Sequence, residues 1–124
     1  MTFKRNIFQE LANRDFKEQS LKIFGNEINI IRVSDNKEIK LNCVITELTR
    51  KQVNKNYDIF VNDFDNFTAS YLDLAFDPTE WQEKFLEMPV IKEQFIINNR
   101  LFSVLDIINN NYAFFNVLFV SIEQ

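Results

Sequence analysis

Histidine is absent from this 124-residue chain, and cysteine, glycine and proline are nearly absent. Without histidine, the commonest general base and the commonest zinc ligand are both missing. The single glycine, Gly25, cannot form the glycine-rich loops that hold phosphate groups, because those loops need several glycines. The single cysteine, Cys43, permits neither an internal disulfide nor a CxxC pair. The sequence therefore has no catalytic or cofactor-binding signature, and we expect neither a cofactor nor a metal.

The overall composition is that of an ordinary folded domain. Hydrophobic residues make up 46% of the chain and charged residues 26%, with 14 phenylalanines. No apolar run approaches the roughly 18 residues that a membrane span needs. Mixed polar residues follow Met1–Asn6 instead of the apolar stretch of a signal peptide, so we expect synthesis in the cytoplasm. The length predicts a single domain over residues 1–124.

A helix is predicted over residues 2–22, within an N-terminal segment 1–25. Its apolar residues recur at helical spacing and form one broad stripe, with charged residues mostly on the other side. The stripe consists of Phe3, Ile7, Phe8, Leu11, Ala12 and Phe16. Gly25 follows the last periodic residue and Lys22 lies in the last turn, a pattern typical of a helix end.

Alternation with period two then predicts a hairpin. Ile28 and Ile30 share one face, residues 34–37 supply turn chemistry, and residues 39–46 alternate again. Cys43 lies on the apolar side of that second strand, which favours a small buried hydrophobe over a reactive thiol. A further strand is predicted over 68–76.

The segment between these strands is ambiguous. Residues 49–56 are polar and basic, which fits a loop or a short helical turn. Residues 57–67 fit either an irregular strand or a long loop with aromatic anchors. We therefore treat residues 49–67 as a long loop.

A short helix should follow at residues 78–87. Asp77 is a good N-cap, Pro78 suits the first helical position, and Pro89 prevents continuation. Trp81 and Phe85 are four residues apart and share a face, so they pin the helix onto the sheet or, alternatively, Trp81 anchors a partner. The first interpretation is favoured.

The last third of the chain is predicted to be β-structure. Residues 95–97 and 100–108 form a hairpin around Asn98–Asn99, because asparagine tolerates the positive φ of tight turns. A second turn at 109–111 leads into a strand over 112–122 that is apolar on both faces, so it is either central or in contact with a partner. The overall fold class is α+β, mainly β.

Charge is distributed unevenly along the chain. Residues 1–56 carry eleven basic and seven acidic groups, whereas residues 57–89 carry one basic and eight acidic groups. Five of those acids could in principle form a hard-cation site, but the mid-loop glycine and bidentate glutamate of helical calcium loops are missing, which favours a solvated acidic face. They are Asp58, Asp63, Asp65, Asp73 and Asp77. The sharper interpretation is head-to-tail association, in which an acidic segment docks beside the basic helix of the next subunit.

The order of elements resembles a known protein family. The chain runs from an N-terminal helix through the segment Phe24–Ile30, a hairpin, a long polar loop and a strand to the ending Phe95–Ile107. This order resembles that of the head–tail joining proteins (tail-attachment or stopper proteins) of long-tailed, lambda-like bacteriophages. The chain differs from the family pattern in having Asn98–Asn99 where a glycine is usual, and residues 77–89 look like an insertion.

The resemblance implies a fold and a function. The fold is a small antiparallel β-barrel or sandwich with a flanking helix. The function is a non-enzymatic ring, commonly six-fold, between portal and tail in the virion, through which DNA passes without specific binding, since a net-negative wall does not retain it. The loop would touch neighbouring subunits. The candidate subunit or partner contacts are Arg50, Lys51, Lys55, Asp58, Phe60, Asp63, Phe64, Asp65, Phe67 and Trp81. The alternative is a small acidic protein-binding inhibitor of the immunity or antitoxin type.

Overall fold

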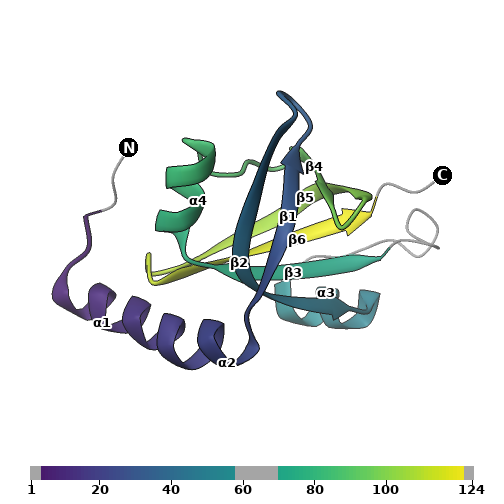
Figure 1. Cartoon of the computed structure of the whole chain (residues 1–124). Coiled ribbons are helices and arrows are strands. Elements are labelled where there is room, and N and C mark those ends of the chain that lie inside the picture. Colours follow the sequence, from purple (N-terminus) through teal and green to yellow (C-terminus); the bar gives the residue numbers. More distant parts are fainter. Residues whose placement is uncertain (1–3, 58–69, 122–124) are drawn as a thin grey trace.

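The computed structural model describes residues 4–57 and 70–121. The fold is α+β and mainly β, as the sequence predicts (Figure 1). The helices are α1 (Ile7–Asp15), the π-helical η1 (Phe16–Leu21), α2 (Lys22–Phe24), α3 (Arg50–Tyr57) and α4 (Pro78–Phe85). The strands are β1 (Asn26–Arg32), β2 (Lys37–Leu48), β3 (Tyr71–Phe76), β4 (Gln94–Ile97), β5 (Arg100–Asn110) and β6 (Phe114–Ser121).

The six strands form one closed antiparallel barrel in the order β1-β2-β3-β6-β5-β4. The pairing of β1 with β4, which sets Ile30 opposite Ile97, closes the ring. The register of β5 on β6 shifts between Val104 and Asp106, and such a bulge strengthens local twist. Side chains that alternate along the strands therefore fill a single interior.

Aromatic side chains dominate the barrel interior. Trp81 of α4 stacks on Phe76 of β3, with ring centroids 4.8 Å apart, and also packs against Phe85 and Phe95. The indole Nε1 donates a hydrogen bond to the Glu87 carbonyl at 2.9 Å. Because α4 inserts both of its aromatic residues into this cluster, the interpretation that Trp81 pins the helix onto the sheet is confirmed.

The local signals around α4 and Cys43 act as predicted. The Asp77 carboxylate accepts a hydrogen bond from the Thr79 amide at 3.1 Å, and Pro78 is the first helical residue. The helix ends at Phe85, two residues earlier than expected, because Leu86 adopts a left-handed conformation with φ of 67°. Cys43 is fully buried, and burial raises the pKa of its thiol to about 12.

Helix α3 occupies residues 50–57 of the predicted loop 49–67, which agrees with the short helical turn that the sequence allowed for residues 49–56. It packs Val53 and Tyr57 on the outside of the barrel, against Tyr71 and Leu118. This second cluster explains why the last strand is apolar on both faces: alternate residues face the interior, while Leu118 lies beneath α3. The rest of the predicted loop, residues 58–67, lies outside the described residues.

Both ends of β5 are set by asparagine turns. Asn98 and Asn99 have φ of 51° and 66°, so the predicted positive-φ hairpin is confirmed. Asn111 and Tyr112 also have positive φ, and β6 therefore begins at Phe114 instead of residue 112. Within the described residues, no helix is long and apolar enough to cross a membrane.

Candidate assembly surface

The α1 part of the N-terminal helix is attached to the barrel through polar groups. Asn13 is buried, and its amide Nδ2 donates to the Ala113 carbonyl at 2.6 Å and to the Asp77 carboxylate at 3.2 Å. The guanidinium of Arg5, just before the helix, donates to the Tyr112 carbonyl at 2.8 Å and to Asp77 at 3.1 Å. The helix thus docks where the β5–β6 turn meets the start of α4.

Asp77 is the centre of this attachment. Besides capping α4 and accepting from Arg5 and Asn13, its carboxylate forms an ion pair with Lys17 at 3.7 Å. The side chains of Arg5 and Asp77 are only 7% and 10% exposed. Removing one partner of such a buried pair generally costs about 3–5 kcal/mol, because the other charge stays buried. One carboxylate therefore fixes the orientation of the helix.

A capping box and a π-helical turn set the bounds of the helix. The side chain of Asn6 accepts a hydrogen bond from the Gln9 amide and the Gln9 side chain accepts one from the Asn6 amide, so the helix begins at Ile7 and not at the predicted residue 2. In η1, hydrogen bonds from i to i+5 bring residues five apart toward one face, and Phe16 and Leu21 are both buried. Phe16 stacks on Phe114, with centroids 4.5 Å apart.

Gly25 ends the helix, as predicted, for a steric reason. Its backbone is extended, with φ of −73°, so no left-handed conformation is required. A Cβ atom at this position would collide with the carbonyl oxygen of Leu21. The glycine therefore allows the chain to leave α2 and enter β1 at once.

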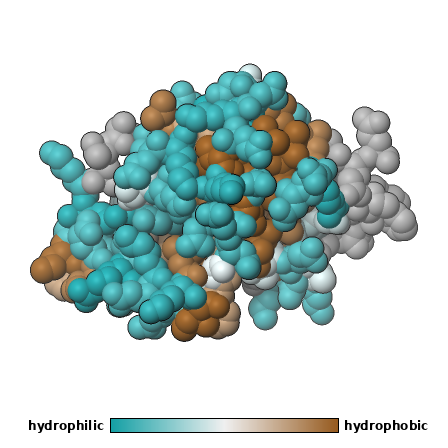
Figure 2. Space-filling model, viewed as in Figure 1, coloured by the Kyte–Doolittle hydropathy of each residue, from teal (hydrophilic) through white to brown (hydrophobic). Residues whose placement is uncertain are grey.

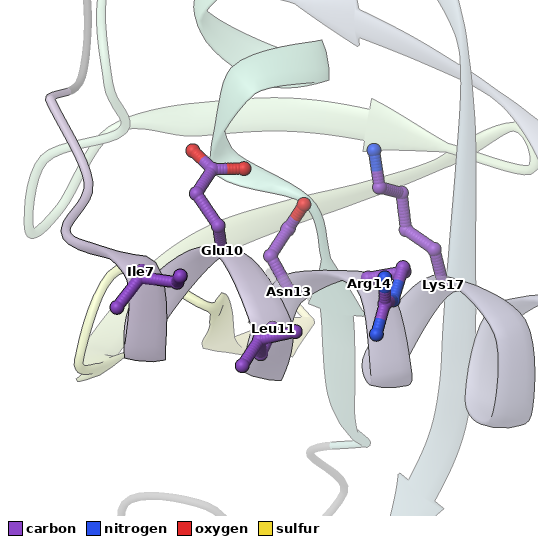
Figure 3. A pocket seen from close by; sticks show the side chains of 6 residues that line it. All are labelled: Ile7, Glu10, Leu11, Asn13, Arg14 and Lys17. Carbon is purple, nitrogen blue, oxygen red and sulfur yellow. The ribbon is translucent and has the colours of Figure 1, made fainter.

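The α1 part of the predicted apolar stripe faces away from the barrel, whereas Phe16, at the end of that stripe, is buried. Ile7, Phe8 and Leu11 are 69%, 76% and 41% exposed, and we call these three residues the α1 stripe. Figure 3 shows Ile7 and Leu11 pointing away from the barrel, whereas Glu10, Asn13 and Lys17 point toward it. An open groove of about 320 Å³ runs along α1, and both sets of side chains line it. An amphipathic helix usually buries its apolar side, so this orientation is the unusual feature of the molecule.

Further apolar surface lies where the helix ends. Ile23 and Phe24 of α2 are each 66% exposed. Figure 2 shows brown surface both at the outer end of α1 and beneath α2. The N-terminal helix therefore presents apolar side chains to solvent at both of its ends, and exposed apolar clusters of this kind mark interaction sites.

The structure separates the contact residues proposed from the sequence. Lys51 and Lys55 are exposed on α3, and Arg50 is the first residue of that helix. Trp81 is 1% exposed in the core and offers a partner no surface in this conformation. The remaining six, Asp58, Phe60, Asp63, Phe64, Asp65 and Phe67, lie outside the described residues.

Sequence reasoning recognised the α1 stripe but did not identify it as a contact surface. Periodicity defines two faces of a helix without saying which one docks. The face that contacts the barrel is determined by Asp77 and Ala113, some sixty to a hundred positions away, which accept hydrogen bonds from Asn13. A buried asparagine among exposed neighbours is a signal only once the fold is known.

A second polar network lies on the outside of the barrel near α3. Asn116 Nδ2 donates to both carboxylate oxygens of Asp73, at 3.1 and 3.3 Å, and Asn110 donates to Asn116 at 2.8 Å. Burial raises the pKa of Asp73, and the Asn116 hydrogen bond acts in the opposite direction. In the described part of the chain, no three Cys, Asp or Glu residues are grouped so as to hold a metal ion. This network joins β3, β5 and β6 in the barrel wall.

Comparisons with known proteins identify no relative: no family model, no curated protein and no solved structure matches this chain. The function must therefore be argued from the surfaces just described and from the resemblance in element order.

Proposed function

We propose that this chain is a non-enzymatic structural protein of a phage or prophage virion, a head–tail connector or tail-attachment component that assembles as a ring between portal and tail. The observation that carries the proposal is the α1 stripe. The helix is held by polar contacts to Asp77 and Ala113 while its apolar side remains exposed. Such an arrangement suits a helix that completes its burial against another subunit.

The fold provides a second line of support. The resemblance implies a small β-barrel or sandwich with a flanking helix, and the chain forms a closed barrel with a helix along its outside (Figure 1). A small barrel with exposed apolar helix residues can serve many functions, however, so the fold alone does not decide the role.

The partners follow from the proposal. They are further copies of this chain in a ring, which is commonly six-fold in the family that the chain resembles, together with a portal-side or adaptor protein and a tail-side protein. Assembly would take place in the bacterial cytoplasm, and the product would be part of the virion. No specific nucleic-acid binding is proposed, since the net charge of −4 disfavours retention of DNA that passes through.

Self-association of the purified full-length chain tests the proposal. We expect a monomer at low micromolar concentration and rings at high concentration, seen by sedimentation velocity and by negative-stain electron microscopy. Association should be strengthened by a portal-side or tail-side protein encoded beside this gene. A fixed dimer at every concentration would contradict the ring. A chain that stays monomeric and forms a tight one-to-one complex with a basic toxin would contradict the connector and favour the acidic inhibitor.

A further inference from the structure

A second exposed apolar patch lies at the end of α4. Leu86, Val90 and Ile91 are 68%, 59% and 50% exposed, and we call these residues the α4 patch. Leu86 follows the last helical residue and is held in a left-handed conformation. Figure 2 shows brown surface at this end of α4. Three large aliphatic side chains therefore face solvent on one short connection.

The α4 patch lies on a fixed part of the chain. The Lys92 amide donates to the Val104 carbonyl at 2.8 Å, and the Val104 amide donates back to the Glu93 carbonyl at 2.9 Å. The Glu93 carboxylate also accepts from the Val90 amide at 3.1 Å. These bonds fasten the connection to β5, so the patch is a preformed surface and not a mobile loop.

The α1 stripe and the α4 patch are separate in space and differ in charge. In Figure 1, α1 runs along the bottom of the molecule, whereas the end of α4 is near the top. Residues 4–24 carry five basic and three acidic groups, and residues 78–93 carry two basic and four acidic groups. Arg14 is exposed beside the stripe, and Glu83 and Glu87 are exposed beside the patch. Opposite charge around two apolar surfaces favours contact between them.

We propose that the α1 stripe of one copy docks on the α4 patch of a second copy. This inference rests on the proposed function, because it supplies the contact from which a ring is made. Two different surfaces on one chain form a heterologous, head-to-tail interface, and repetition of such an interface closes into a ring when the rotation allows. Each copy then covers both of its exposed apolar surfaces with its two neighbours.

Disulfide trapping between variants that each carry one added cysteine tests this contact. Leu11→Cys places a thiol in the stripe and Ile91→Cys places one in the patch. Cys43 needs no replacement, because it is fully buried. The control is Glu47→Cys, which is exposed at the end of β2 away from α1 (Figure 1). Each full-length variant is oxidised alone and in mixtures, at a concentration where the chain associates, and analysed on non-reducing gels.

The expected result is a covalent dimer from the mixture of Leu11→Cys and Ile91→Cys, at least about tenfold more abundant than from either variant alone or from mixtures with Glu47→Cys. The double variant should give a ladder of multimers. Strong dimerisation of Leu11→Cys with itself would overturn the inference in favour of a two-fold helix–helix contact. Rings without any stripe-to-patch disulfide would overturn the inference and leave the proposed function standing.

A variant that places a charge in the α4 patch provides the second test, by sedimentation. Ile91→Lys should weaken self-association at least about tenfold in sedimentation experiments, with an unchanged thermal melt, because Ile91 is half exposed in the monomer. Unchanged association of Ile91→Lys would overturn the docking model. If no oligomer forms and the wild-type chain instead binds anionic lipid vesicles through Leu11, the inference and the proposed function are both refuted.

Discussion

Asp73 illustrates what burial does to a single carboxyl group. It is half-buried on the barrel wall, and its raised pKa follows from that burial. Between the ordinary aspartate pKa of about 3.9 and the raised value, the folded protein binds more protons than the unfolded chain. The free energy of unfolding therefore decreases as pH rises through this interval. Asn116, which donates to both carboxylate oxygens, offsets part of this cost.

Asp73→Asn should remove this pH dependence. The amide oxygen still accepts a hydrogen bond from Asn116, but no charge is buried at neutral pH. The stability of the variant relative to wild type should rise with pH across the interval above about pH 4 and then level off. Urea unfolding measured at a series of pH values checks this. A relative stability that falls with pH would contradict the prediction.

Asp35 supplies a control of opposite sign. A hydrogen bond from Arg32 lowers its pKa to about 2. A lowered pKa contributes stability above the unfolded value that is lost as pH falls through the folded value. Asp35→Asn should therefore lose relative stability as pH rises from 2 to 4, whereas Asp73→Asn gains it at higher pH. The two aspartates differ by environment and not by residue type.

At the scale of elements, the N-terminal helix depends on a few contacts. Phe16 is its main apolar anchor, through the stack on Phe114, while Phe8 on the same helix is 76% exposed. Because the α1 stripe buries little area in the monomer, loss of the Phe16 contact should loosen the helix without unfolding the barrel.

Phe16→Ala should therefore free the helix locally. Truncating a buried phenylalanine costs about 3 kcal/mol or more. We expect amide protection to fall strongly in residues 7–24 and to stay high in β5 and β6, measured by hydrogen exchange with mass spectrometry. Phe8→Ala is the matched control, and it should leave protection of the isolated monomer unchanged. Equal loss from both variants would show that the stripe is buried in solution.

The same helix shows what sequence could and could not predict. Periodicity located the helix, alternation located the β1–β2 hairpin, and Asp77–Pro78 located the start of α4, because these signals act over a few residues. The sequence leaves residues 49–56 open between a loop and a short helical turn, because the formation of α3 depends on a non-local contact of Val53 and Tyr57 with Leu118. The side of α1 that faces the barrel is likewise determined by residues distant in the sequence. The candidate surface could therefore be identified only from the fold.

At the scale of the whole molecule, the proposed assembly combines apolar and charged contributions. The α1 stripe and α4 patch supply apolar area, and the surrounding charges are of opposite sign. Exposed charges are screened over about 10 Å at 0.1 M salt and about 3 Å at 1 M. Burial of apolar surface, in contrast, is not weakened by sodium chloride.

Formation of the proposed ring should therefore weaken but persist as sodium chloride is raised. We expect the dissociation constant, from sedimentation equilibrium, to increase roughly three- to tenfold between about 0.05 M and 0.5 M salt, as screening removes the charge complementarity. The thermal melt of the dilute monomer serves as the control and should change little. Arg14→Glu should show weaker association at low salt and a flatter salt dependence, because Arg14 is exposed beside the stripe. Association that is independent of salt in both proteins would mean that the apolar surfaces act alone and that the uneven charge of the chain has no part in assembly.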